Sequence, residues 1–387
     1  MEIKSTITTA DDAARAVAEL CEPLAGFTPD LAMLFVTPDY GPSFDEMIGG
    51  LRDALDARNL VGATCEGVLG VDREVENGPG AALWAGKLPG VRVFPFVLDQ
   101  NDFVTLKNVK DWEDRLGVTP DDVPTFIILP DPFSIQFAAY LKIVDEVFPG
   151  SATVGGVISG ASVPGRNRLF LNDQVLRQGM VGVSLTGDYR VSTIVSQGCR
   201  PVGPAFIITK ADSNVIFELG GREAYAVLKE LHASCNEEER TLMQNGLHLG
   251  RAIDERSGHF EAGDFLIRNV AGFVNDKGLA VTDYVRAGQT VQFHVRDAVS
   301  ADSEMRHLLE SSIRKMTHKP EGGLLFNCNG RGTRLFSKPN HDIQMVTELI
   351  PDCPLAGFFA AGEIGPVGGR TFVHGLTSSL ILFHGSE

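Results

Sequence analysis

The stretch from Leu355 to Leu376 reads L-A-G-F-F-A-A-G-E-I-G-P-V-G-G-R-T-F-V-H-G-L, and its glycine pattern decides the fold. Six glycines stand among apolar residues, together with Glu363, Arg370 and His374. Because glycine weakens the interior of a helix or strand, this density marks backbone that turns sharply or approaches another group closely. That group is either a ligand, which the three polar side chains favour, or another piece of backbone inside a packed sheet.

The same glycine spacing occurs elsewhere in the chain. The pattern G-x4-G-x2-G at Gly357, Gly362 and Gly365 is repeated over residues 62–70, and residues 155–160 keep its first interval. Each glycine segment follows an apolar strand and an amphipathic helical segment. The expected strands are 31–36, 125–129 and 323–327, and the expected helices are about 43–59, 134–147 and 341–349. Three matching units indicate internal repetition, and each reads as two parallel strands joined by a crossover helix.

Further short strands follow each unit and are expected to run antiparallel to the parallel pairs. They are predicted at 81–98, where two strands flank a Leu-Pro-Gly turn, at 181–196 and at 379–383. All nine histidines lie at or beyond His232, which sets the second half of the chain apart. The sequence therefore predicts an α/β protein of two domains, built from repeated strand–helix–strand units with mixed sheets.

Composition narrows the classes of partner. The 387 residues include 43% hydrophobic and 22% charged residues, close to a soluble globular average. The net charge of −16 argues against nucleic acid and against an anionic membrane surface. The N-terminus lacks the pattern of a signal peptide, and six scattered cysteines form no C-x-x-C pair. We expect a cytoplasmic protein with reduced thiols that binds small molecules or other proteins.

Several phrases of the sequence resemble FIST-domain proteins, in the order that the family shows them. They are L-V-G-A-T-C-E-G-V-L-G, G-L-H-L-G-R-A-I-D, F-N-C-N-G-R-G and G-F-F-A-A-G-E-I-G-P-V-G-G-R. The resemblance implies a FIST N-terminal domain over residues 1–212 and a FIST C-terminal domain over 213–387. It also implies a sensory protein in signal transduction that binds a small ligand such as an amino acid. Because no signalling segment is recognised in the chain, a separate signalling protein is the expected partner.

Candidate ligand-binding residues combine cations, acids and thiols, and Cys328 with the turn after it stands at the carboxyl end of a repeated strand, where doubly wound sheets bind their ligands. Arginines grip carboxylates through two parallel hydrogen bonds, glutamates receive ammonium groups, and a nearby guanidinium makes a thiol more reactive. Such residues together would suit a zwitterion. The candidates are Cys65, Glu66, Arg251, Asn327, Cys328, Arg331, Glu363, Arg370 and His374.

Other interpretations of these residues stay open. Pairing of the charged side chains with one another would explain the same residues, and packing in the core would equally explain His374 and His248. If the protein is an enzyme, Cys328 is the nucleophile and His374 its base; a protein-interaction scaffold is a further alternative. No metal site is expected from the spacing, and no cofactor is predicted. The resemblance implies one more alternative, a haem-binding sensor of nitric oxide, because some bacterial members of the family are haem-containing sensors. Haem would need an axial histidine, which the sequence does not single out.

Overall fold

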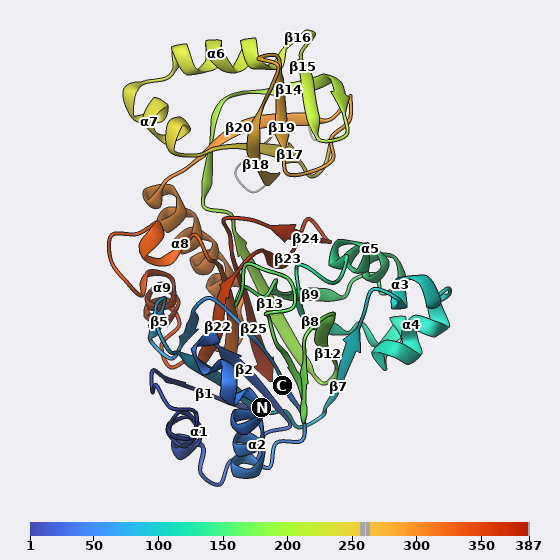
Figure 1. The fold of residues 1–387 in the computed structure, drawn as a ribbon, viewed down its shortest axis with the longest axis vertical. Helices are drawn as coiled ribbons and strands as arrows, with labels where there is room; N and C mark the ends of the chain where they lie inside the picture. Colours follow the sequence, from blue (N-terminus) through green and yellow to red (C-terminus); the bar gives the residue numbers. More distant parts are fainter. Residues whose placement is uncertain (256–259, 261–263, 386–387) are drawn as a thin grey trace. The chain divides into compact units, whose positions relative to one another are not determined.

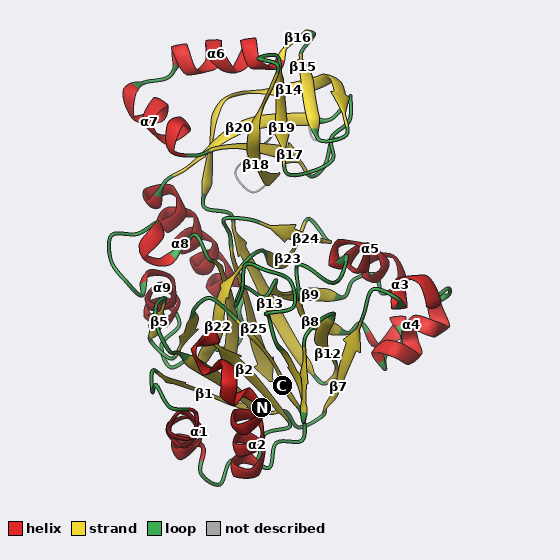
Figure 2. Cartoon of the chain, in the orientation of Figure 1, coloured by secondary structure: helices red, strands yellow, loops and turns green. Residues whose placement is uncertain are grey.

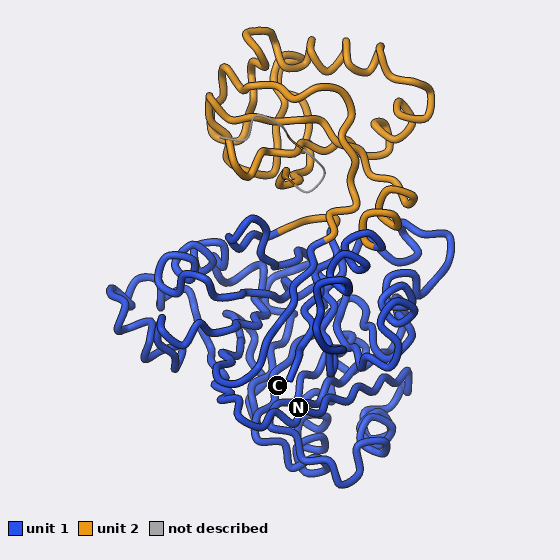
Figure 3. Tube along the Cα trace, turned by 180° about the vertical axis from the view of Figure 1, so that it is seen from behind, with its two compact units in different colours: residues 1–195, 306–373, 377–387 blue, residues 196–305, 374–376 orange. Residues whose placement is uncertain are grey.

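The computed structural model describes residues 1–255, 260 and 264–385, and the chain divides into two compact units (Figure 3). Unit 1 comprises residues 1–195, 306–373 and 377–387, and unit 2 comprises residues 196–305 and 374–376. Unit 1 is therefore assembled from both ends of the sequence. The predicted domain boundary at residue 212 falls at the last residue of strand β14 (Cys199–Asp212), so the compact units divide the chain at other points.

Unit 1 contains three six-stranded sheets, and each is built around one of the predicted parallel strand pairs (Figure 1). The pairs, with their crossover helices, are β2 (Leu31–Val36), α2 (Phe44–Leu55) and β3 (Leu60–Thr64); β8 (Thr125–Pro130), α5 (Phe137–Val147) and β9 (Ala152–Gly156); and β21 (Gly322–Cys328), α9 (His341–Leu349) and β22 (Leu355–Ala360). The α/β prediction is confirmed, and so are the three repeated units.

Two further strands extend each sheet on the side of the first parallel strand, and the nearer of the two runs antiparallel to it. They are β6 (Ala81–Lys87) and β1 (Glu2–Thr8) in the first sheet, β12 (Met180–Gly187) and β7 (Val91–Leu98) in the second, and β25 (Ser378–Gly385) and β13 (Tyr189–Ser196) in the third. Consecutive strands such as β6 and β7 thus follow one another around a turn but belong to different sheets.

A hairpin from another repeat completes each sheet on the opposite side. The hairpin β4 (Val68–Gly70)–β5 (Arg73–Val75) joins the third sheet, β10 (Leu169–Leu171)–β11 (Gln174–Leu176) joins the first, and β23 (Glu363–Val367)–β24 (Arg370–His374) joins the second. The hairpin that follows each repeat therefore pairs with the sheet of another repeat: the first with the third sheet, the second with the first, and the third with the second. This exchange ties the N-terminal and C-terminal parts of the chain into one unit.

The repeated glycines serve close contact between strands. A Cβ atom added at these glycines would meet a main-chain oxygen of the paired strand at 2.1 Å or less: Gly62 with Leu34 O, Gly155 with Ile128 O, and Gly357 with Leu325 O. Real Cβ atoms do not approach an oxygen so closely, so only glycine fits these three equivalent positions. The backbone interpretation of the glycine pattern is thereby favoured over the ligand interpretation.

Apolar side chains from the three sheets meet in a common core. Phe35, Phe326 and Phe358 pack there with ring centroids 5.1–6.2 Å apart. The outer faces of the sheets carry helices, as Figure 2 shows for α2, α5 and α9. Further helices in this unit are α1 (Ala13–Cys21), α3 (Asp102–Thr105) and α4 (Val109–Leu116). The parallel strands are buried on both faces, which explains their continuous apolar sequence.

In the described part of unit 2, seven strands form an antiparallel sheet with its own core. Its strands, in spatial order, are β14, β20 (Thr290–Arg296), β17 (Leu247–Ala252), β18 (Phe265–Val274), β19 (Gly278–Val281), β15 (Val215–Leu219) and β16 (Arg222–Glu223). An additional β14–β15 pairing closes this order into a ring. The helices α6 (Ala224–Ser234) and α7 (Glu237–Asn245) lie between β16 and β17 in the sequence. The helix α8 (Ala298–Lys315) leads from this unit into unit 1. None of the described helices is both long and apolar enough to cross a membrane.

Candidate functional site

A cavity of about 240 Å³ lies in unit 1 beside the turn that follows β21. This turn stands at the carboxyl end of a central parallel strand, where α/β proteins commonly bind ligands. The first and third repeats both contribute to the cavity wall. The lining residues are Glu66, Gly67, Glu76, Asn77, Asn329, Thr333, Arg334 and Phe359.

The turn after β21 has a defined backbone shape. The Cys328 amide donates to the Thr377 carbonyl at 2.9 Å, and the Arg331 amide donates back to the Cys328 carbonyl at 2.8 Å. The Gly330 amide lies 3.4 Å from the Cys328 sulfur. A short 3₁₀ helix, Gly332–Arg334, follows, and it begins at the left-handed φ of +58° that Gly332 adopts. Glycine at this position lets the chain turn back toward the cavity.

An ion pair between Glu66 and Arg334 spans one wall of the cavity. The Arg334 guanidinium donates to the Glu66 carboxylate and, at 2.6 Å, to the Asn329 carbonyl. The side-chain amide of Asn329 donates to the Glu66 carboxylate at 3.0 Å. The hydrogen bond that Arg334 donates to Glu66 raises the pKa of Arg334, aided by the nearby Glu76 and Cys328. With side chains 57% and 32% exposed, Arg334 and Glu66 form a pair that solvent and small molecules can reach.

A second carboxylate, Glu76, completes the polar wall. It accepts hydrogen bonds from the Thr333 amide at 2.9 Å and from the Thr333 hydroxyl at 2.7 Å. The cavity is thus lined by two carboxylates, one guanidinium and the side-chain amides of Asn77 and Asn329. Such a set can bind an ammonium group and a carboxylate of one molecule at the same time.

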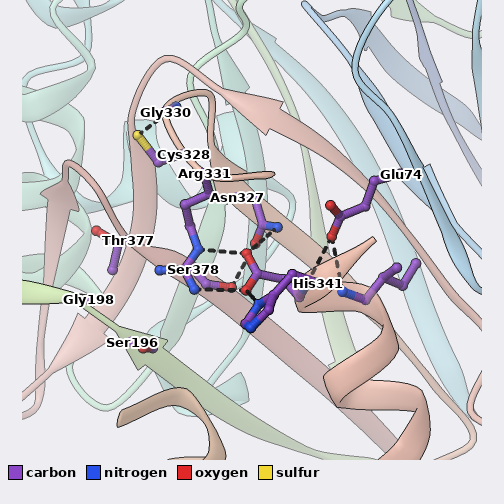
Figure 4. A network of polar contacts seen from close by, with 12 residues as sticks. Glu74, Ser196, Gly198, Asn327, Cys328, Gly330, Arg331, His341, Thr377 and Ser378 are labelled. Carbon is purple, nitrogen blue, oxygen red and sulfur yellow. Dashed lines mark hydrogen bonds and ion pairs between the residues drawn. The ribbon is translucent and has the colours of Figure 1, made fainter. Parts of the chain in front are cut away.

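A buried polar network lies on the other side of the same turn (Figure 4). Arg331 is fully buried and donates to both oxygens of Asp342, from Nε at 2.6 Å and from Nη2 at 2.8 Å. Asn327 donates to Asp342 at 2.9 Å and accepts from the Ser378 hydroxyl at 2.7 Å. Although burial alone would raise the pKa of Asp342, the charge and hydrogen bonds of Arg331 hold it well below its usual range. The Arg331 guanidinium therefore compensates a buried carboxylate and stabilises the fold.

Glu74 joins this network from the hairpin that the first repeat contributes. Its Oε1 atom accepts from the main-chain amides of Asp342 and Ile343, both at 3.1 Å. Its Oε2 atom is buried and has no hydrogen-bond partner among the described residues. Burial, with the negative charge of Asp342, raises the pKa of Glu74 to about 7. This carboxyl group therefore changes its protonation near neutral pH.

The structure distributes the residues predicted from sequence over several places. Glu66 lines the cavity, and Cys328 lies in the adjoining turn, 7% exposed. Asn327 and Arg331 belong to the buried network. Cys65 lies in the common core, where its thiol donates a hydrogen bond to the Val36 carbonyl. Burial raises the pKa of this thiol well above its usual value.

The remaining predicted residues lie elsewhere. Glu363 is fully buried and accepts from the Thr377 amide at 2.9 Å. Arg370 is exposed at the start of β24, and His374 is buried at its end; β24 belongs to the second sheet, whereas Cys328 ends a strand of the third. Arg251 belongs to unit 2, where it donates to Asp283 at 3.2 Å.

Of the described residues that line the cavity, only Glu66 was predicted; the polar side chains that were missed are Glu76, Asn77, Asn329, Thr333 and Arg334. Arg334 stands three residues after Arg331 in the run N-C-N-G-R-G-T-R, so the two arginines looked alike in sequence. Their difference lies in the partners that folding brings to each. His248 also falls outside the site: it is buried in unit 2 with Nδ1 3.1 Å from Asn269 Oδ1, and burial lowers its pKa to about 4.

The chain is similar to known proteins along its whole length. Residues 30–222 match the FIST N domain and residues 224–366 match the FIST C domain. An uncharacterized protein of Mycobacterium tuberculosis is 39% identical over 99% of this chain and 100% of its own length. An uncharacterized protein of Mycobacterium bovis is 36% identical over 99% of both chains. Among solved structures, a cyanuric acid hydrolase from A. caulinodans covers 100% of this chain and 99% of its own at 8% identity, with a TM-score of only 0.36.

FIST domains are associated with sensing in signal transduction. With both domain matches in order and full-length relatives at 36–39% identity, this chain belongs to the family that joins a FIST N domain to a FIST C domain.

Proposed function

We propose that this protein is a sensory protein that binds a small zwitterion, such as an amino acid, in the cavity lined by Glu66 and Arg334. The observation that carries the proposal is the solvent-accessible ion pair at the cavity wall. The pair joins residues 268 positions apart in the sequence. A zwitterion offers the same two charges, so it can replace each partner of the pair with a matching group.

The chemistry assigns one end of the ligand to each charge. The ligand's carboxylate binds the guanidinium of Arg334, which can present two parallel N–H donors. The ligand's ammonium group binds Glu66 and, across the cavity, Glu76. A volume of about 240 Å³ lies below the range of about 300–1,000 Å³ that is usual for drug-sized ligands, which favours a small molecule.

Binding would change the connection between two repeats. Glu66 follows β3 of the first repeat, and Arg334 follows β21 of the third. A ligand that inserts between Glu66 and Arg334 replaces their direct ion pair with contacts to its own charged groups. The connection between the two turns then differs between the free and the bound protein, and this difference provides a signal. We place this sensor in the cytoplasm, acting through a separate signalling protein, in keeping with six scattered cysteines that form no C-x-x-C pair.

The cavity does not fit a haem. Among the described residues that line it, none is a histidine, cysteine or methionine that could serve as an axial ligand of the iron. The proposal therefore relies on the side chains of the protein alone.

A thermal-shift screen of the whole chain with amino acids, simple amines and simple carboxylates tests the proposal. A zwitterion at a hundred times its dissociation constant should add about 2.7 kcal/mol to the unfolding free energy. The response should be lost in Arg334→Met and Glu66→Gln. It should persist in Arg370→Met, whose side chain is exposed on β24, away from the cavity lining. The proposal fails if no zwitterion stabilises the protein, or if Arg334→Met responds as the unchanged protein does.

A further inference from the structure

A second cavity, of about 510 Å³, lies elsewhere in unit 1. Three segments line it: residues 190–195 of the edge strand β13, residues 308–318 in the last turns of α8 and just beyond, and residues 384–385 at the end of β25. It shares no lining residue with the cavity beside Glu66. It is therefore a separate space and requires its own account.

The charged side chains that line this cavity are basic, whereas the chain as a whole is acidic. The protein carries 50 acidic and 34 basic residues, yet among the described residues no aspartate or glutamate lines this cavity. Arg190, Lys315, His318 and His384 all do. The acid that acts on His384 is Glu321, which lies outside the lining. An anionic molecule is consequently favoured here over a cationic one.

The cationic and the apolar residues occupy different depths. Arg190 and Lys315 are exposed, so their charges lie toward solvent. Val191, Leu308 and Met316 are half-buried and give the wall its apolar surface. Deeper still, His384 is 9% exposed, and its Nε2 atom lies 3.0 Å from the Ser192 hydroxyl. Burial lowers the pKa of His384, which favours its uncharged form, so the positive charge of the lining comes mainly from Arg190 and Lys315.

We propose that this cavity binds an amphipathic carboxylate, with the carboxylate at Arg190 and Lys315 and the apolar part against Leu308 and Met316. The volume lies within the usual range of about 300–1,000 Å³ for ligands of such size. This inference is independent of the zwitterion site and adds a second ligand of different chemistry.

The position of the cavity along the chain suits a sensory protein. Unit 1 is interrupted after Val195, in β13, and resumes at Arg306, in α8. The two main walls of the cavity are thus the segments through which the chain leaves unit 1 and returns to it. A ligand that links β13 to α8 restrains both of these connections.

Isothermal titration of the whole chain with octanoate tests the proposal. Acetate carries the same head group without the apolar chain, and octylammonium carries a chain of the same length with the opposite charge. Octanoate should bind at least about tenfold more tightly than either, a difference of about 1.4 kcal/mol. Failure of octanoate to bind, or equal binding of octylammonium, would overturn the proposal.

Matched variants locate the binding. Lys315→Glu should weaken octanoate binding about tenfold through charge reversal. Lys319→Glu, four residues away, should leave it unchanged because Lys319 is outside the lining. Ser311→Trp should abolish binding by filling the cavity, with the circular dichroism spectrum checking that the fold is kept. Arg334→Met should bind octanoate normally, which separates this site from the zwitterion cavity; an unaffected Lys315→Glu would refute the placement of the carboxylate.

Discussion

Arg331 and Arg334 lie three residues apart in one turn, and the structure uses them in opposite ways. The Arg331 side chain is 0% exposed and bonds to both oxygens of a buried Asp342. The Arg334 side chain is 57% exposed and pairs with Glu66 at the cavity wall. The buried pair is fixed by neighbours on every side, whereas the exposed pair can be exchanged for a ligand. The same residue type therefore supports the fold at one position and recognition at the other.

The largest effect is expected from breaking the buried pair. Arg331→Met leaves the Asp342 charge in the interior without its partner, which should lower the unfolding free energy by about 3–5 kcal/mol. Urea denaturation measures this loss. The double variant Arg331→Met, Asp342→Leu should recover part of it, because the unpaired charge is gone. A single variant that loses less than about 1 kcal/mol would place Arg331 with the exposed pairs.

Glu74 should make stability depend on pH near neutrality. The pKa of Glu74 is raised to about 7 in the folded protein, from 4.5 ordinarily, so folding favours its protonated form. Its contribution is complete below about pH 4.5 and is lost as the pH rises through about 7. Between pH 5 and 8 the protein should lose roughly 1–3 kcal/mol through this group.

The variant Glu74→Gln, which cannot ionise, tests this directly. Its unfolding free energy should change less between pH 5 and 8 than that of the unchanged protein, as measured by urea denaturation at each pH. Glu46→Gln, on the exposed side of α2, should keep the original pH dependence. Identical pH profiles for Glu74→Gln and the unchanged protein would contradict the assignment.

The repeated units could be predicted from sequence because their signals are local. The strand expected at 31–36 matches β2, and the helix expected at 341–349 matches α9. The glycine spacing marked the three second strands, where Gly62, Gly155 and Gly357 approach a neighbouring backbone. The exchange of hairpins could not be predicted. The strands β4 and β22 pair although they are almost 300 residues apart, and a local sequence pattern does not indicate which distant strand a hairpin pairs with.

The site was predicted only in part, for the same reason. Glu66 and the turn after β21 were recognised by their residue types and their place at strand ends. Which arginine faces solvent depends on Asp342 and on Phe336, whose ring centroid lies 5.3 Å from the Arg331 guanidinium. Burial of this kind comes from tertiary packing, so two arginines in one turn give equal signals in the sequence.

Gly332 joins the two regions and should have an intermediate effect. Gly332→Ala puts a side chain at a left-handed φ of +58°, and the new Cβ would lie 2.6 Å from the Glu76 carboxylate. The left-handed conformation alone costs about 1–2 kcal/mol, and displacement of Glu76 from Thr333 adds to it. Gly369→Ala, at φ +77° with no atom within 4 Å, measures the conformational cost alone. Thermal or urea unfolding should show the greater loss for Gly332→Ala; equal losses would mean that Glu76 moves away freely.

The smallest change in stability is expected at Arg334. Exposed ion pairs contribute about 0.2–1 kcal/mol, because solvent screens them and two long side chains lose freedom. Arg334→Met should therefore lower the unfolding free energy by less than about 1 kcal/mol, several times less than Arg331→Met. Urea denaturation of both variants in one buffer measures the contrast, and added salt should reduce the Arg334 effect further. A loss at Arg334 as large as that at Arg331 would mean that the cavity pair is part of the folding core, and the exchange of Glu66 for a ligand would then cost too much to serve as a sensor.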